Sequence, residues 1–148
     1  MSGEEIKKRL LYIEDVFKKP LETDPIYSML TDNGFDVMVA ENGEEALKKL
    51  DQGQYDCIIL DIMLPHEGKD IPKDIPRYRT GIYILERLRE GKFPKNIDTS
   101  VVVISAIADM DDTRKIREEL NPDRYLEKPV HLPVLLKAVE EVLKQKDK

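Results

Sequence analysis

The sequence predicts an α/β domain, a doubly wound parallel sheet of five strands with helices on both faces. Five short apolar runs divide the chain into units that average about 30 residues, the size of strand–helix units. Each run is continuous rather than alternating, which is typical of strands that are covered on both faces. A segment with apolar residues at helical spacing follows each run. The length of 148 residues suits one such domain and not two.

The apolar runs are rich in β-branched residues or bounded by polar ones, and we expect one strand in each. Because strands alternate with helical segments, we expect parallel pairing, and right-handed crossovers then place helices on both faces of the sheet. The runs are Leu10–Ile13, Val37–Ala40, Cys57–Leu60, Val101–Ile104 and the short Tyr125–Leu126.

The first helix has clear signals at both ends. Asp24 is expected as its N-cap with Pro25 at the first helical position, and Asn33 and Gly34 are expected at its end. The second helix is expected over Gly43–Leu50, where alanine and leucine side chains lie on one face.

The remaining helices differ in how much apolar surface they offer. Gly81–Glu90 and Leu132–Lys144 each carry several apolar residues at helical spacing. The fourth helix, Asp112–Leu120, offers only Ile116 and Leu120 on a charged background, so we expect it to be thinly anchored.

The composition argues against several classes of protein. The chain has 24 Lys and Arg against 30 Asp and Glu, and a net charge of −6 argues against direct nucleic-acid binding. The single Cys57 excludes an intramolecular disulfide and a Cys-rich zinc site. No run approaches the roughly 18 apolar residues of a membrane span, and the N-terminus lacks the apolar core of a secretory signal. We therefore expect a cytoplasmic protein without membrane insertion.

Candidate site residues follow four of the five apolar runs. Glu14 and Asp15 follow the first, Asp61 the third, Ser105 the fourth and Lys128 lies just beyond the fifth. Each residue alone is most simply a turn, cap or solvated residue. Ligands of such folds bind at the carboxyl ends of the strands, so together these side chains predict one site.

The chemistry of this set favours phosphoryl transfer. Three carboxylates would repel one another, and a hard cation such as Mg2+ relieves the repulsion with oxygen ligands. A lysine adds positive charge for a phosphoryl group, and a carboxylate can serve as the nucleophile. Because no glycine-rich phosphate loop follows a strand, side chains and metal would have to hold the phosphoryl group.

The ordered motifs resemble the receiver domain of response regulators in two-component signalling. They are LLYIED, YDCIILDIMLP, TG before an apolar helix, VVVISA and YLEKP, and they extend from about Lys8 to Leu143. The resemblance implies a flavodoxin-like, CheY-like (βα)5 sheet with strand order 2-1-3-4-5. It also implies a single receiver domain over residues 1–148, with a core of about 8–143 and an insertion of about 66–80.

The resemblance assigns roles to the residues at the strand ends. It implies that Asp61 is the phosphoacceptor and that Lys128 contacts the phosphoryl oxygens. It implies that Mg2+ is held by Glu14, Asp15, Asp61 and the backbone carbonyl of Met63.

Two further residues are implied to form a switch. Ser105 would turn toward the new phosphate, and the ring of Tyr125 would follow it. Phosphorylation replaces one negative charge by about two and adds acceptor oxygens, which biases a two-state surface over the fourth and fifth strands and the fourth helix.

The resemblance also implies partners. A sensor histidine kinase or a phosphotransfer protein would donate the phosphoryl group, and a downstream protein target would read the changed surface. The only chemistry implied is self-phosphorylation and self-dephosphorylation, so we do not expect an enzyme. Nothing follows Lys148 that would bind DNA, so we expect action by protein contact. A stand-alone protein and a fragment of a larger hybrid protein both stay open.

The enlarged connection after Asp61 departs from the family pattern. Typical receivers have a shorter segment before the glycine that opens the third helix. A lid, a partner-specific surface and a tolerated surface loop are all open as its role. Arg77 and Arg79 are candidates to pair with phosphate or with the acidic cluster.

Two smaller departures carry further expectations. An insertion of about three residues in FKKPLETDP makes the first helix start late, at Pro25. Met63 and Ile107 occupy positions that, in the family, tune phosphate loss by positioning water. Because both are apolar, the resemblance implies a slowly decaying phosphoryl-aspartate.

The same residues bear on three alternative functions. An aspartate-nucleophile phosphohydrolase needs a second acid two residues after the nucleophile, where Met63 stands. A flavodoxin-like FMN carrier needs a hydroxyl-rich phosphate loop, where Glu14 and Asp15 would repel the phosphate. A pseudo-receiver, which keeps the fold as an interaction module without phosphorylation, stays open.

Overall fold

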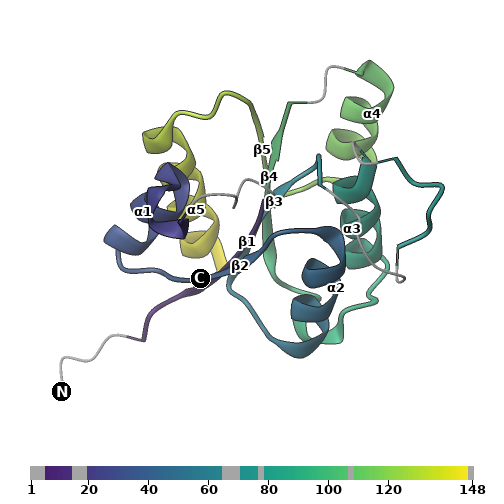
Figure 1. Ribbon diagram of the computed structural model, residues 1–148. Helices are drawn as coiled ribbons and strands as arrows, with labels where there is room; N and C mark the ends of the chain where they lie inside the picture. Colours follow the sequence, from purple (N-terminus) through teal and green to yellow (C-terminus); the bar gives the residue numbers. More distant parts are fainter. Residues whose placement is uncertain (1–5, 15–19, 65–70, 77–78, 107–108, 147–148) are drawn as a thin grey trace.

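The strands form one parallel sheet in the order β2-β1-β3-β4-β5, which confirms the order that the family resemblance implied (Figure 1). The computed structural model describes residues 6–14, 20–64, 71–76, 79–106 and 109–146. Within this part of the chain the strands are β1 Arg9–Ile13, β2 Asp36–Ala40, β3 Cys57–Asp61, β4 Ser100–Ser105 and β5 Arg124–Glu127.

The central strands explain why the apolar runs are continuous. Every residue of β3 and β4 is buried, because helices cover the sheet on both faces. In register, Ile59 of β3 pairs with Val102 of β4, and Asp61 pairs with Ile104. The carboxyl ends of β3 and β4 therefore lie side by side at one edge of the sheet.

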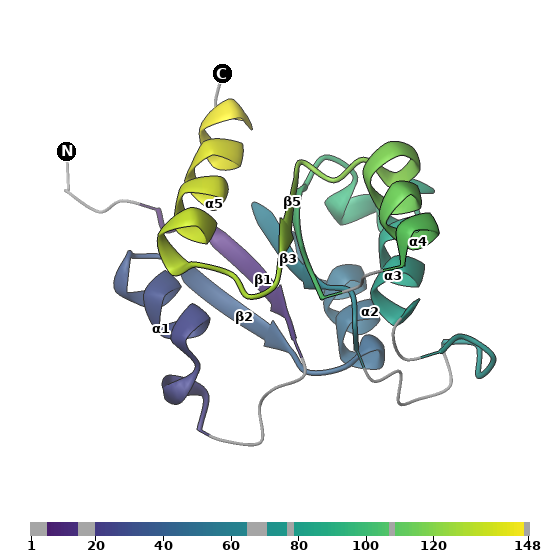
Figure 2. The same ribbon diagram turned by 90° about the horizontal axis from the view of Figure 1, so that it is seen from above.

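The helices lie in two layers, α1 and α5 on one face and α2, α3 and α4 on the other (Figures 1 and 2). Single 3-10 turns, η1 (Leu21–Thr23) and η3 (Pro94–Asn96), were not predicted. The helices are α1 Pro25–Asp32, α2 Gly43–Gln52, α3 Thr80–Arg89, α4 Met110–Arg114 and α5 Leu132–Lys146.

The two layers make two apolar cores that the sheet separates. One contains Leu50, Leu85 and Ile116 from the α2, α3 and α4 side. The other contains Leu30 and Val139 from the α1 and α5 side. Cys57 is fully buried in the second core, and burial raises the pKa of its thiol well above the ordinary value.

The predicted ends of α1 are confirmed. The Asp24 side chain accepts a hydrogen bond from the Ile26 amide at 3.2 Å, and Pro25 is the first helical residue. Asn33 caps the other end, and Gly34 follows with a φ of 89°, in the left-handed region that glycine adopts without strain.

The fourth helix is longer and less regular than predicted. It begins at Met110 and continues from Lys115 to Leu120 as a π-helix, η4. Its apolar contacts are as few as predicted, since Ile116 and Leu120 are buried and Met110 is 85% exposed. Polar contacts from α3 supplement them: Lys115 pairs with Glu86 at 3.0 Å, and the Arg89 Nε donates to the Leu120 carbonyl at 2.7 Å.

In the described part of the enlarged loop, Ile71 is buried, whereas Pro72, Lys73, Asp74 and Pro76 are exposed. Ile71 is 1% exposed, and the Arg79 amide donates to the Pro76 carbonyl at 2.8 Å. Arg77, a candidate phosphate partner, lies outside the described residues. Within the described ranges, no helix combines the length and the apolarity that crossing a membrane would need.

Candidate functional site

The carboxyl edge of the sheet brings four of the predicted site residues into one region. Glu14 directly follows β1, Asp61 ends β3, Ser105 ends β4 and Lys128 directly follows β5. Glu14, Asp61 and Ser105 are 3%, 2% and 1% exposed. Asp15, which was predicted as a metal ligand, lies outside the described residues.

The Lys128 ammonium joins the two described carboxylates. Its Nζ donates to Asp61 Oδ2 at 2.6 Å and to Glu14 Oε2 at 3.1 Å. Both carboxylates are almost fully buried, whereas the Lys128 side chain is 32% exposed. One half-buried cation therefore compensates two buried anions, which leaves this group of three with a net negative charge.

The balance of effects keeps Lys128 charged. Burial alone lowers the pKa of Lys128, but the hydrogen bond to Asp61 and the charges of Asp61 and Glu14 outweigh it. The net shift of this pKa is upward, so the ammonium persists throughout the neutral range.

The backbone after β3 holds the other oxygen of Asp61. The Met63 amide donates to Asp61 Oδ1 at 3.0 Å, and the Ile62 amide donates to the Ile104 carbonyl at 3.2 Å. The Asp61 side chain is thus oriented from two sides, by a backbone amide and by the lysine. Met63 itself is 39% exposed beside it.

Gly81 supports the same segment from α3, a role that sequence reasoning missed. Its amide donates to the Ile62 carbonyl at 2.8 Å. A Cβ at this position would lie 2.4 Å from Ile62 Cα and 2.7 Å from the Asp61 carbonyl oxygen. Only glycine allows α3 to approach β3 so closely. The motif TG indicated the position, but the close approach itself depends on the tertiary structure.

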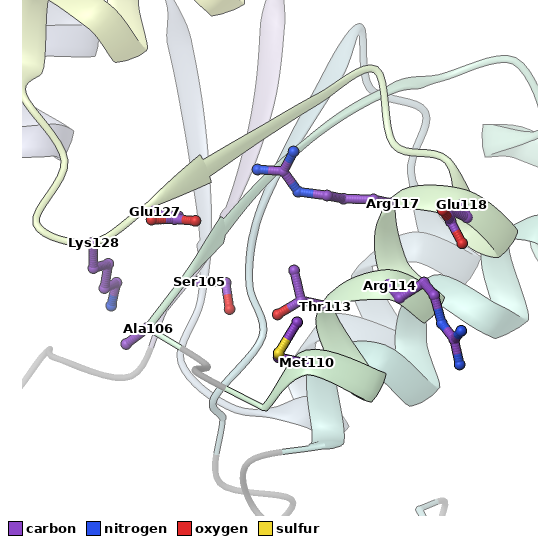
Figure 3. Close-up of a pocket in the computed structure, with 9 residues that line it drawn as sticks. All are labelled: Ser105, Ala106, Met110, Thr113, Arg114, Arg117, Glu118, Glu127 and Lys128. Atoms are coloured by element: carbon purple, nitrogen blue, oxygen red, sulfur yellow. The ribbon is translucent and has the colours of Figure 1, made fainter.

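A groove of about 540 Å³ opens between the end of β4 and α4. Figure 3 shows Ser105 and Lys128 on the strand side, with Met110 on the helix and Arg117 reaching from it toward β5. The Lys128 amide donates to the Ser105 carbonyl at 2.9 Å. The groove therefore begins at the predicted site and ends on α4.

Tyr125 lies on β5, the strand beside β4. It pairs with Val103, two residues before Ser105, and the Arg117 guanidinium carbon lies 4.4 Å from the centre of its ring. Its phenolic oxygen is buried and has no hydrogen-bond partner among the described residues. The ring is half-buried against the α2–α4 core.

Replacement of Tyr125 by phenylalanine is expected to keep the stability or raise it by up to about 1 kcal/mol, because the hydroxyl is buried and has no hydrogen-bond partner in the described part of the chain. Urea unfolding followed by circular dichroism measures this. The matched control is Tyr55→Phe, which removes a hydrogen bond from the Tyr55 hydroxyl to the Lys49 carbonyl at 3.3 Å. A larger loss for Tyr125→Phe than for the control would contradict the prediction.

The donor set at the strand ends fits Mg2+ in part. The carboxylates of Glu14 and Asp61 both contact the Lys128 ammonium, so their oxygens lie around one positive charge. Carboxylate oxygens are also the ligands that Mg2+ prefers. Within the described residues no third acidic or histidine side chain joins them. Asp15 and the Met63 carbonyl remain predicted ligands.

The structure shows Arg79 in contact with Asp112 of α4. The prediction paired it with phosphate or with the strand-end carboxylates, but Arg79 Nη2 donates to Asp112 Oδ1 at 2.8 Å, in the first turns of α4. Asp112 was not predicted as a functional residue. Its partner comes from a loop 33 residues away, which no local pattern indicates.

Comparison with known proteins gives a family and a set of structures. The family model of the response regulator receiver domain matches residues 18–140. The transcriptional regulatory protein CiaR of Streptococcus pneumoniae is 35% identical over 117 residues, which are 79% of this chain and 45% of CiaR. The chain thus spans about half the length of the curated relatives it matches.

Solved structures agree with the fold. A CheY-like receiver domain protein from Methanospirillum hungatei superposes with a TM-score of 0.74 at 21% identity, over 96% of this chain and 98% of that one. The response regulator TrrA of Thermotoga maritima, solved in complex with Mg2+ and BeF, gives a TM-score of 0.65 at 27% identity. That match covers 91% of this chain and 98% of TrrA.

Proposed function

Because the chain belongs to the response regulator receiver domain family, we propose that Asp61 is a phosphoacceptor for a sensor histidine kinase or a phosphotransfer protein. The observation that carries the proposal is the buried Asp61 carboxylate at the end of β3, with Lys128 Nζ 2.6 Å from its Oδ2. An almost fully buried carboxylate that contacts a lysine ammonium beside a groove is typical of a functional site, whereas a carboxylate that only aids solubility is exposed.

The proposed step transfers a phosphoryl group from the donor directly to Asp61. An oxygen of Asp61 attacks the phosphorus of a phosphohistidine, an O–P bond forms, and the N–P bond breaks with its electron pair returning to the imidazole nitrogen. The Lys128 ammonium then neutralises the phosphoryl oxygens, which carry about two negative charges. Since Lys128 already contacts Asp61 and Glu14, it needs no large movement to do so.

We assign the metal site to Glu14, Asp15, Asp61 and the backbone carbonyl of Met63. The oxygen donors of the described members support this, as does the TrrA structure solved with Mg2+ and BeF. When bound, Mg2+ would neutralise charge that develops on the transferred phosphoryl group.

The proposed signal is a change of the surface between β4, β5 and α4. Ser105 borders the groove beside Lys128, so its hydroxyl can donate to a new phosphate, and Tyr125 would move with it. The output would be contact with a downstream protein, in the cytoplasm and without membrane insertion. The curated relatives are named as transcriptional regulators, yet this domain would not itself contact nucleic acid.

Incubation with Mg2+ and acetyl phosphate is expected to add one phosphate to the wild-type chain, measured by intact mass. Asp61→Asn is expected to abolish the gain, and EDTA to reduce it strongly. The matched control Asp51→Asn removes an exposed carboxylate on α2 and is expected to gain phosphate like the wild-type chain. No gain on the wild-type chain with several phosphodonors would instead favour the pseudo-receiver.

The phosphorylated chain is expected to lose its phosphate slowly. The Met63 side chain, 39% exposed beside Asp61, has no strong acceptor to orient a water. Met63→Glu is expected to speed the loss about tenfold, less than the roughly 100-fold of a fully positioned base. The decay is followed by intact mass, with Met110→Glu on α4 as the control. A wild-type half-life of seconds would contradict the prediction. Ile107, the second residue on which the predicted slow loss rests, lies outside the described residues.

A further inference from the structure

The end of the enlarged loop connects the phosphoacceptor strand to α4. On one side, the Gly81 amide donates to the Ile62 carbonyl at 2.8 Å, one residue after Asp61. On the other side, Arg79 Nη2 donates to Asp112 Oδ1 at 2.8 Å. The two residues that make these contacts, Arg79 and Gly81, are two positions apart in the sequence. Residues 79–81 therefore contact both the segment that follows Asp61 and the first turns of α4.

The ion pair at the α4 end of this link is asymmetric in its burial. The Asp112 side chain is 5% exposed, whereas that of Arg79 is 49% exposed. Among the described residues, the second carboxylate oxygen of Asp112 has no hydrogen-bond partner. Loss of Arg79 would leave a buried charge uncompensated, so the position of α4 depends on where the loop holds this arginine.

The loop end borders α3 and α4, which lie side by side in both views (Figures 1 and 2). Together with Ile75 and Pro76, Arg79 borders a cavity of about 250 Å³. Across the cavity lie Glu86 of α3 and Lys115, which pair at 3.0 Å. A loop that is merely tolerated on the surface needs none of these contacts.

We propose that Arg79 is a positioning residue that couples phosphorylation of Asp61 to α4, in parallel with Ser105 and Tyr125. The inference rests on the proposed function. A shift of the β3–α3 junction on phosphorylation is transmitted through the Gly81 backbone to Arg79, and from its guanidinium to Asp112. Coupling is reciprocal, so a partner that displaces the loop end changes how readily Asp61 is phosphorylated.

The test compares hydrogen exchange of peptides covering 109–121, with and without phosphorylation, after intact mass has shown that each protein carries phosphate. The variants are Arg79→Gln, Arg79→Lys, Asp112→Asn and the double variant Arg79→Gln/Asp112→Asn. The matched control is Arg114→Gln. Like Arg79→Gln, it removes one positive charge. That charge belongs to an exposed ion pair between Arg114 and Asp111, 3.6 Å apart, which lies within α4.

In the wild-type chain, phosphorylation is expected to change the exchange equilibrium of 109–121 at least about fivefold, the lower limit of typical allosteric coupling. Arg79→Gln and Asp112→Asn are expected to reduce that change to less than about twofold, and the double variant to reduce it no further. Arg79→Lys is expected to restore part of it, and Arg114→Gln to retain it. A merely stabilising Arg79 would alter exchange equally in both states and leave the phosphorylation-dependent change intact.

A full response in phosphorylated Arg79→Gln would overturn this proposal and leave the phosphoacceptor function standing. Absence of phosphate on the wild-type chain would overturn both, and it is seen in the mass spectrum before any exchange is measured.

Discussion

Replacement of Lys128 by methionine is expected to lower the free energy of unfolding of the metal-free protein by about 3 kcal/mol, the lower end of the range for breaking a buried ion pair. Methionine keeps most of the side-chain volume but leaves Glu14 and Asp61, 3% and 2% exposed, without their shared cation. The lower end applies because the Lys128 side chain is itself 32% exposed.

Urea unfolding in EDTA measures this loss, and Lys115→Met is its control. Lys115 pairs with Glu86 at 3.0 Å, but 39% and 31% of these side chains are exposed, so we expect less than about 1 kcal/mol. Excess Mg2+ is expected to recover more stability in Lys128→Met than in the wild-type chain, because a bound cation replaces the missing ammonium. Equal losses of stability in the two lysine variants would show that the Lys128 ammonium does not specifically stabilise the buried carboxylates of Glu14 and Asp61.

Gly81→Ala is expected to cost about 3 kcal/mol, the upper end for overpacking, because backbone atoms rather than side chains block the new methyl group. The nearest atoms are Ile62 Cα at 2.4 Å and the Asp61 carbonyl oxygen at 2.7 Å. The helix must move away from β3, which breaks the bond from Gly81 to the Ile62 carbonyl. We therefore also expect phosphate uptake at Asp61 to fall strongly.

Gly53→Ala provides the comparison for Gly81→Ala. A Cβ at Gly53 would meet the Tyr55 side chain at 3.0 Å, and a side chain can move where a backbone cannot. The expected cost is below about 1 kcal/mol. Urea unfolding and intact mass after acetyl phosphate treatment measure both variants. A Gly81→Ala protein with wild-type stability would mean that α3 does not approach β3 as described.

The sheet and the location of the site could be predicted from the sequence because both depend on local patterns. Continuous apolar runs mark strands buried on both faces, as β3 and β4 are. Parallel strands end at one edge, so residues such as Asp61 and Lys128 had to lie near each other. The structure adds the contact itself, 2.6 Å between Lys128 Nζ and Asp61 Oδ2.

Other features could not be predicted, because they join elements distant in the sequence. The π-helical turn of η4 and the Arg89 contacts with its end depend on how α3 packs against α4. The pairing of Arg79 with Asp112 depends on the path of the loop. Propensity and periodicity describe only one element at a time.

Because Cys57 is buried, chemical labelling of its thiol can be used to measure unfolding of the chain. This thiol is fully buried on the central strand β3, and its raised pKa disfavours the thiolate, which is the reactive form. A thiol reagent can therefore modify it only when the middle of the sheet opens. The chain has no tryptophan and a single cysteine, so labelling kinetics at this one atom would follow opening of the sheet centre without an introduced probe.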